Sequence, residues 1–162
     1  DVVEMLQSLA SQYSVSLEWE AEEGIEENRF DAEGIHRALL NVVTNAIEAC
    51  AEQAEAVVRI TIGARDSCHF ARVVDNGPGI SVEQLPDIFT AFVSGKGSRG
   101  TGLGLAVSRK IMREHGGDLT VESQSGQGAE FVFTLPVRDE NVNEDGESDS
   151  LATGLSPPKN TN

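Results

Sequence analysis

The sequences DNGPGI at residues 75–80 and GTGLGL at residues 100–105 are the most informative parts of this 162-residue chain. They follow a helix-like segment that carries Asn41 and Asn45, one helical turn apart. A single glycine-rich turn is weak evidence for a binding site, because such turns are common. The interpretation therefore rests on the order and the combination of the three segments.

The two glycine-rich segments suit different parts of one ligand. Glycines let backbone N–H groups approach phosphate oxygens, and a helix that follows adds free N-terminal donors and the positive end of its dipole. Residues 100–104, which open the apolar run 105–107, fit that description. Asp75 instead follows the strand-like segment 70–74, where a carboxylate can accept a hydrogen bond from an exocyclic amine. We therefore expect phosphate binding at residues 100–104, adenine selection by Asp75, and ATP as the ligand.

The length and composition predict one domain and a tail. The apolar patterning ends near Val137, which leaves enough chain for one core that buries roughly two-thirds of the unfolded surface. Residues 138–162 are rich in Asp, Glu, Asn, Ser, Gly and Pro, so we expect a disordered acidic tail there and a domain at residues 1–137. The chain begins at Asp1 and has no apolar run near the ~20 residues that cross a bilayer. We expect a cytoplasmic fragment of a longer protein, with reduced thiols at Cys50 and Cys68 and a parent that is either membrane-anchored or soluble.

The net charge of −15 argues against a nucleic-acid partner, yet the charge is unevenly placed. Residues 1–33 hold ten acids and one base, whereas residues 88–113 hold five bases and no acid. Lys96 and Arg99 lie among glycines and predict a cationic lid beside the phosphates. For Arg109, Lys110 and Arg113, the sequence is equally consistent with a basic surface for a polyanionic ligand and with a solvated helix face.

The periodicity predicts helices packed on one face of a mixed sheet. Asp31 is a candidate N-cap for a helix that ends near Cys50, and Gln124 to Gly128 form a hairpin turn. The expected helices cover residues 2–12, 32–50, 82–92 and 103–115. The expected strands cover residues 15–19, which should be half-buried, and residues 57–64, 69–74, 119–123 and 129–135.

Asn41 and Asn45 share one margin of the apolar helix face. Mg²⁺ prefers oxygen ligands and shares the phosphates of a nucleotide, so an amide oxygen is a suitable ligand. We assign Asn45 as the metal ligand and Asn41 as a phosphate contact. Glu48 stays open between a water-mediated metal contact and a solvated acid. For His36 and His115 a structural role is favoured over that of a phosphate acceptor.

Four segments resemble the motifs of sensor histidine kinases. NVVTNA at residues 41–46 resembles the N box, DNGPG at 75–79 the G1 box, FTAF at 89–92 the F box, and GTGLGL at 100–105 the G2 box. The resemblance covers residues 1–137 and implies the Bergerat ATP-binding fold of the GHKL superfamily, an α/β (α+β) two-layer sandwich with a mixed, mostly antiparallel sheet backed by three helices. Residues 41–49 and the short lid look closest to the nitrogen-regulation type of kinase.

The resemblance also implies the roles of individual residues. Asp75 would bind the adenine amino group, Asn45 would hold Mg²⁺, and Lys96 with the G2-box amides would grip the phosphates. The nucleotide site would comprise Asn41, Asn45, Glu48, Asp75, Gly77, Gly79, Ile80, Phe89, Lys96, Gly100, Thr101, Gly102, Leu103 and Gly104. Ala91, Val93, Gly95 and Ala129 depart from the usual pattern, so we expect weaker binding.

The chain lacks the segment that would accept the phosphoryl group, because no His-Glu-x-x-x-Pro-like sequence occurs in it. We therefore expect ATP binding here and transfer of the γ-phosphoryl group to a histidine on a separate dimerisation hairpin, with a response regulator as the further partner. The fragment itself is expected to be monomeric. The alternatives are a conformational ATPase or an anti-sigma serine kinase, both of which tend to have a glutamate at the Asn41 position, and a regulatory module without turnover.

Overall fold

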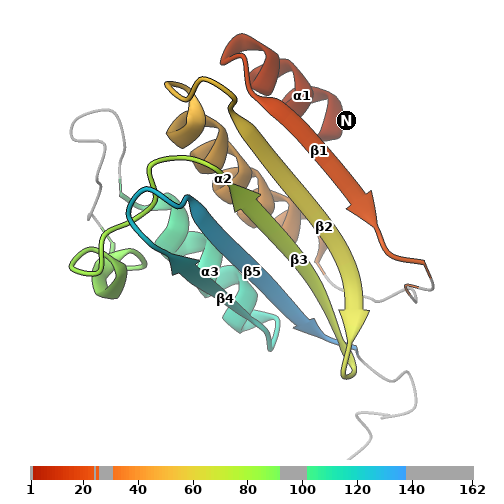
Figure 1. The fold of residues 1–162 in the computed structure, drawn as a ribbon. Helices are drawn as coiled ribbons and strands as arrows, with labels where there is room; N and C mark the ends of the chain where they lie inside the picture. The colour runs from red at the N-terminus through yellow and green to blue at the C-terminus, as the bar shows by residue number, and fades with distance from the viewer. Residues whose placement is uncertain (1, 24, 26–30, 92–101, 138–162) are drawn as a thin grey trace, which may run out of the picture.

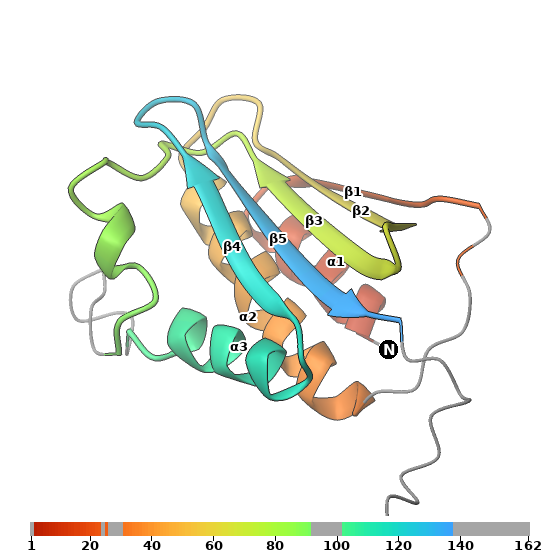
Figure 2. The same cartoon turned by 90° about the horizontal axis from the view of Figure 1, so that it is seen from below.

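The computed structural model describes residues 2–23, 25, 31–91 and 102–137. Within them, five strands form one sheet and three α-helices cover one of its faces (Figures 1 and 2). The elements in chain order are α1 (Val2–Gln12), β1 (Ser16–Ala21), α2 (Ala32–Cys50), β2 (Val57–Arg65), β3 (Cys68–Asp75), the 3₁₀ helix η1 (Leu85–Asp87), α3 (Gly104–Glu114), β4 (Asp118–Ser123) and β5 (Ala129–Pro136). The expected two-layer sandwich is confirmed.

The sheet is mixed but mostly antiparallel. Its strand order is β1-β2-β3-β5-β4, so that β5, the last strand in the described part of the chain, lies between β3 and β4. The β1–β2 pair is parallel, and the other three pairs are antiparallel. This order places the carboxyl end of β3 beside the start of β5, since Asp75 pairs with Ala129.

Helix α2 lies at the centre of the helical layer (Figure 2). Asp31 caps it by accepting a hydrogen bond from the Glu33 N–H at 3.1 Å, as predicted. Its apolar stripe packs on the sheet, where Val42, Val43 and Ile47 are fully buried. Alternate residues of β5, such as Phe131 and Phe133, contribute the sheet side of this core. Burial of these side chains holds α2, and thus the two asparagines at its margin, in a constant position on the sheet.

Two expectations about local structure were wrong. Residues 82–92 were expected to be helical, but the described part contains only the 3₁₀ helix η1. An α-helix that began at Val82 would need the N–H of residue 86 as a donor, and Pro86 has none; it stands instead in the first turn of η1, where proline is tolerated. Trp19 was expected to be half-buried but is 56% exposed, because β1 is an edge strand. In the described ranges, no helix combines the length and the apolar character that a membrane span requires.

Candidate functional site

Asp75 is a buried carboxylate at the last position of β3, with only 6% of its surface exposed. Its Oδ1 atom accepts hydrogen bonds from the Gly77 N–H at 2.9 Å and from the Ala129 N–H at 3.3 Å. Burial raises the pKa of Asp75, although both hydrogen bonds act in the opposite direction. No described residue donates a hydrogen bond to its second oxygen, Oδ2. The carboxylate is thus held by one oxygen and can offer the other to a ligand donor.

Asn76 and Cys50 lie beside this carboxylate and help to hold the end of β3 in place. The Asn76 amide donates to the Glu55 carbonyl at 2.6 Å and accepts from the Val57 N–H at 2.8 Å, which ties the end of β3 to the loop before β2. The fully buried Cys50 Sγ lies 3.6 Å from Asn76 Oδ1 and 4.0 Å from Asp75 Oδ1. Burial, and then the charge of Asp75, raise the pKa of the Cys50 thiol. Neither residue was predicted to belong to the site, although an asparagine before Gly-Pro is itself a turn signal.

The glycine-rich loop after Asp75 packs closely against the β4–β5 hairpin. Gly79 has a φ of +70°, and a Cβ atom there would clash with the Gln124 carbonyl. Gly128 has a φ of +77°, and a Cβ atom there would clash with the Asp75 carbonyl. The backbones also bond directly, from the Gly126 N–H to the Pro78 carbonyl at 2.7 Å. These positions therefore require glycine for conformational and steric reasons together.

Ser123 closes the same junction with its side chain, and the sequence analysis did not identify it. Its Oγ accepts a hydrogen bond from the Ile80 N–H at 2.8 Å and donates to the Gly128 carbonyl at 2.6 Å. A hollow of about 230 Å³ adjoins this junction, and its lining includes Asp75, Ser123, Gly128 and Ala129. Gly77, Gly79 and Ile80 lie with Asp75 at this end of the sheet, beside the β4–β5 hairpin.

Helix α2 connects this end of the site to the glycines at the start of α3. Asn41, Asn45 and Glu48 lie on α2 and are half-buried. Cys50 is nine positions further along α2 than Asn41, which is about 13.5 Å along the axis. At Asn41, in the middle of α2, a Cβ atom on Gly104 would lie 3.8 Å from the side-chain Cγ. The start of α3, at Gly104 of the G2 box, therefore lies beside the N box at the middle of α2 and away from the Cys50 end that adjoins Asp75.

Phe89 lies apart from the hollow at Asp75. Its ring packs under the Arg109 guanidinium, whose Cζ atom is 4.6 Å from the ring centroid. A larger hollow, of about 470 Å³, lies here rather than at the carboxylate; it is lined by Phe89, Ala106, Arg109, Lys110, Arg113 and Glu114. Since Phe89 lines this hollow and not the one at Asp75, the structure does not bring it to the adenine end of the site.

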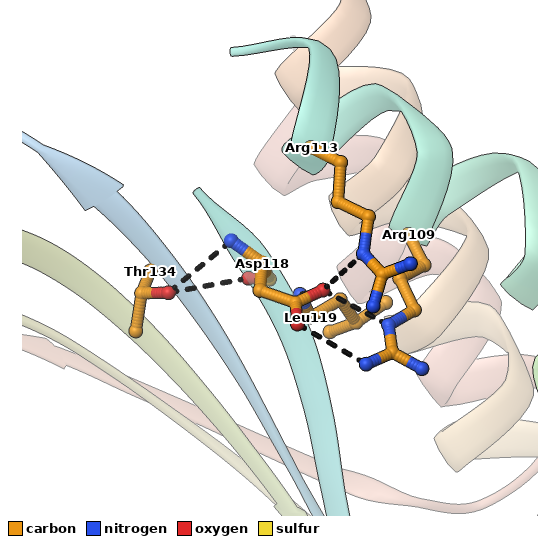
Figure 3. A network of polar contacts seen from close by, with 5 residues as sticks. All are labelled: Arg109, Arg113, Asp118, Leu119 and Thr134. Atoms are coloured by element: carbon orange, nitrogen blue, oxygen red, sulfur yellow. Dashed lines mark hydrogen bonds and ion pairs between the residues drawn. The ribbon is translucent and has the colours of Figure 1, made fainter. Parts of the chain in front are cut away.

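Arg109 and Arg113 converge on Asp118 at the start of β4 (Figure 3). Arg109 donates to both carboxylate oxygens, at 2.9 and 3.1 Å, and Arg113 donates to Oδ1 at 3.1 Å. The Arg109 hydrogen bonds hold the pKa of Asp118 far below its usual range. These two arginines thus join α3 to β4, which is a structural role rather than that of a solvated face.

Part of the predicted site lies outside the described residues. This applies to Lys96, Gly100 and Thr101, to Arg99 of the expected lid, and to Val93 and Gly95 among the departures. Of the two histidines, His36 is exposed on α2, and His115 Nδ1 lies 2.7 Å from the Ile111 carbonyl at the end of α3. The His115 contact agrees with the structural role predicted for it.

The chain belongs to the family described as histidine kinase-, DNA gyrase B-, and HSP90-like ATPases, whose profile matches residues 30–139. Sporulation kinase D of Bacillus subtilis (strain 168) is 43% identical over 103 residues, which are 64% of this chain and 20% of that protein. Sensor histidine kinase ZraS of Klebsiella oxytoca is 37% identical over 141 residues, which are 85% of this chain and 29% of that protein. The chain thus spans less than a third of these relatives.

Solved structures agree with this assignment. Full-length ShkA in complex with AMPPNP is similar with a TM-score of 0.75 and 30% identity, over 84% of this chain and 28% of that one. The catalytic domain of the histidine kinase ThkA is similar with a TM-score of 0.73 and 30% identity, over 84% of this chain and 89% of that one. The chain therefore corresponds to the ATP-binding catalytic domain of sensor histidine kinases, and the predicted family and fold are confirmed.

Proposed function

We propose that this domain binds Mg²⁺-ATP and donates the γ-phosphoryl group to a histidine on a separate dimerisation hairpin. The observation that carries the proposal is the Asp75 carboxylate, buried at the end of β3 with Oδ1 held by two backbone N–H groups. Oδ2 suits the exocyclic amine of adenine, which guanine lacks at that position. Gly77, Gly79 and Ile80 form the wall beside it, held by Ser123.

The phosphates belong beside the middle of α2 in this proposal, where Asn41 lies. The amino end of α3 begins at Gly104 against Asn41, and a helix start attracts anions through its free N–H groups and dipole. The resemblance adds Lys96 and the G2-box residues Gly100, Thr101, Gly102 and Leu103 to this end. Phe89 is proposed to support the lid from the α3 side through its contact with Arg109 and not to touch the base.

Asn45 and its neighbours fit a magnesium ion that is shared with the nucleotide. Asn45 offers a hard amide oxygen from a half-buried position between the adenine and phosphate ends, and Glu48 is one turn further along α2. Bound Mg²⁺ would neutralise phosphate charge and hold the phosphate oxygens in place. The chain's own residues bind and orient the nucleotide, whereas the acceptor domain supplies the nucleophile and its base.

The proposed partners follow from these separate roles, in which this domain binds the nucleotide and another domain accepts the phosphoryl group. The dimerisation and phosphoacceptor domain of the same kinase would receive the phosphoryl group, and a response regulator would receive it in turn. The isolated fragment is proposed to be monomeric. This part of the parent protein is proposed to lie in the cytoplasm. The narrower resemblance to nitrogen-regulation kinases, and the weaker binding expected from Ala129, stay predictions.

Calorimetric titration of the full chain with ATP and GTP, with and without Mg²⁺, tests the proposal. We expect adenine-selective binding that Mg²⁺ strengthens, and Asn45→Ala to remove most of the Mg²⁺ dependence. Gln53→Ala, an exposed amide beyond the end of α2, is the matched control and should leave both properties unchanged. Absence of ATP binding, or equal affinity for GTP, would overturn the nucleotide assignment. Phosphorylation of an added acceptor hairpin then separates a kinase from a module that only binds.

A further inference from the structure

Ser108 is a fully buried hydroxyl between the helices that carry the N box and the G2 box. It lies on α3, and none of its surface is exposed. Three polar groups surround its Oγ atom: the Gly104 carbonyl at 2.8 Å, the Ala38 carbonyl at 3.3 Å and the Asn41 Nδ2 atom at 3.3 Å. The first belongs to α3, and the other two belong to α2.

The chemistry of these groups decides how the Asn41 amide is turned. A hydroxyl has one proton to donate, and both carbonyls around Ser108 can only accept. The proton therefore goes to a carbonyl, and Asn41 must be the donor to Oγ. The opposite orientation of the amide would place a third acceptor against a hydroxyl with one proton, which would leave one of these oxygens without a donor.

We propose that Ser108 is a positioning residue for metal–nucleotide binding. It turns the Asn41 amide so that the nitrogen faces α3 and the carbonyl oxygen remains for a cation or a cation-bound water. The proposal rests on the function proposed above and refines the expected role of Asn41, since a carbonyl oxygen repels a phosphate oxygen and attracts a metal ion. Asn41 then supports Asn45 on the cation through its carbonyl oxygen, while one of the two N–H donors of its amide is taken by Ser108.

The same hydroxyl joins the start of α3 to the N box. Its donation to the Gly104 carbonyl reaches back one turn along α3, and Gly104 packs directly against Asn41. A change at Ser108 therefore acts on the phosphate end of the site while the Asp75 end, at the far end of α2, is left intact. This separation provides the test.

The test compares two ligands on the full chain by calorimetry. We expect Ser108→Ala to weaken binding of ATP in the presence of Mg²⁺ about tenfold. Binding of adenosine in the presence of EDTA should stay within about twofold. In the double variant with Asn41→Ala, the effects should not add, because the hydroxyl acts through that amide. Ser108→Cys keeps the volume with a weaker hydrogen-bonding group, so we expect an intermediate loss, and it serves if the alanine variant does not fold.

Met112→Leu is the matched control, because Met112 is also fully buried on α3 but contacts the core instead of Asn41. It should lower the melting temperature without changing the ratio of the two affinities. Equal losses for adenosine and Mg²⁺-ATP in the serine variants, additive effects with Asn41→Ala, or no loss at all would overturn the proposal. Failure of the wild-type chain to bind Mg²⁺-ATP would instead overturn the proposed function.

Discussion

At the scale of single residues, Asp75 combines two properties that are usually in conflict. It is a charged group in a buried position, and its pKa is raised by that burial. The two N–H groups at Oδ1 compensate only part of the cost. A carboxylate that destabilises the nucleotide-free protein in this way is consistent with a role in binding.

Asp75→Asn should weaken ATP binding by about 10- to 100-fold, because a charge-assisted hydrogen bond to the base is lost. In addition, the amide N–H group can occupy the position of Oδ2, where it would face the donor of the base instead of accepting from it. The melting temperature of the nucleotide-free variant should stay level or rise, since the buried charge is gone. Calorimetry and thermal unfolding of the same samples check both. Unchanged ATP affinity would place the adenine contact elsewhere.

Adenosine binding should also be lost on acidification. The loss should occur at a higher pH than it would for an ordinary aspartate, whose pKa is about 3.9. Because the folded-state pKa of Asp75 is raised, its protonated form is favoured by the fold, and its contribution to instability diminishes as the pH falls through that value. Adenosine is the suitable ligand because it has no phosphate to titrate. An adenosine affinity that stays constant from about pH 7.5 down to the ordinary aspartate value of about 3.9 would contradict this prediction.

At the scale of elements, two junctions hold the site in shape. Ser123 joins the β4–β5 hairpin to the loop after β3, and Asp118 joins α3 to the start of β4. Thr134 of β5 completes the second junction, since its hydroxyl lies 3.3 Å from the Asp118 N–H (Figure 3). The first junction borders the adenine end, whereas the second supports the helix that starts at the phosphate end.

Ser123→Ala should cost about 1 kcal/mol of stability and weaken ATP and adenosine to a similar degree, because Ile80 and Gly128 lose the hydroxyl that links them. Equal losses for the two ligands distinguish this position from Ser108, which lies at the phosphate end. Ser125→Ala, in the exposed tip of the same hairpin, is the control. A loss confined to ATP would contradict the placement of Ser123 at the base.

Asp118→Asn should destabilise the domain by no more than about 1 kcal/mol at neutral pH, because the ion pair is a third exposed and screened by solvent. The folded-state pKa of Asp118 is lowered, so its contribution is present above the unfolded pKa of about 3.9 and is lost as the pH falls below it. The difference between the melting temperatures of the two proteins should therefore stay constant from about pH 7 to pH 5 and shrink as the pH falls further towards about 2. A difference that stayed constant down to about pH 2 would be contrary to this account.

At the scale of the whole molecule, the described structure ends at Val137, which is hydrogen-bonded to the turn between β2 and β3. The Val137 N–H bonds to the Ser67 carbonyl at 2.9 Å, beside the last pair of the β3–β5 ladder. The described helical layer and sheet are formed by residues up to Pro136, and the family profile ends at residue 139. The proposed binding site draws on α2, β3, the β4–β5 hairpin and the start of α3, which all precede Val137.

A chain truncated after Val137 should therefore keep its fold and bind ATP within about twofold of the full chain. Circular dichroism, thermal unfolding and calorimetry would measure this. Truncation after Phe133 is a suitable comparison, since it removes Leu135 from the core and should unfold the domain. A large loss of ATP affinity in the longer truncation would assign a function to the acidic tail.

The sequence alone determined the elements, the family and the main ligand. Apolar periodicity located α2 and the strands, and the order of the asparagine helix and the glycine-rich segments indicated the family and an ATP site. It failed at residues 82–92, where the proline outweighed the apolar spacing, and at Trp19, because no local pattern tells an edge strand from a central one.

Only the tertiary structure decided which side chains act together. Asn76, Cys50, Ser123 and Ser108 take part through contacts between segments 19 to 70 residues apart in the chain. Serine and asparagine have no pattern that predicts such partners, because their hydrogen bonds depend on where two distant elements meet. The insertion of β5 between β3 and β4 is what brings Ala129 to Asp75, and that order follows from packing of the whole sheet rather than from any local stretch of sequence.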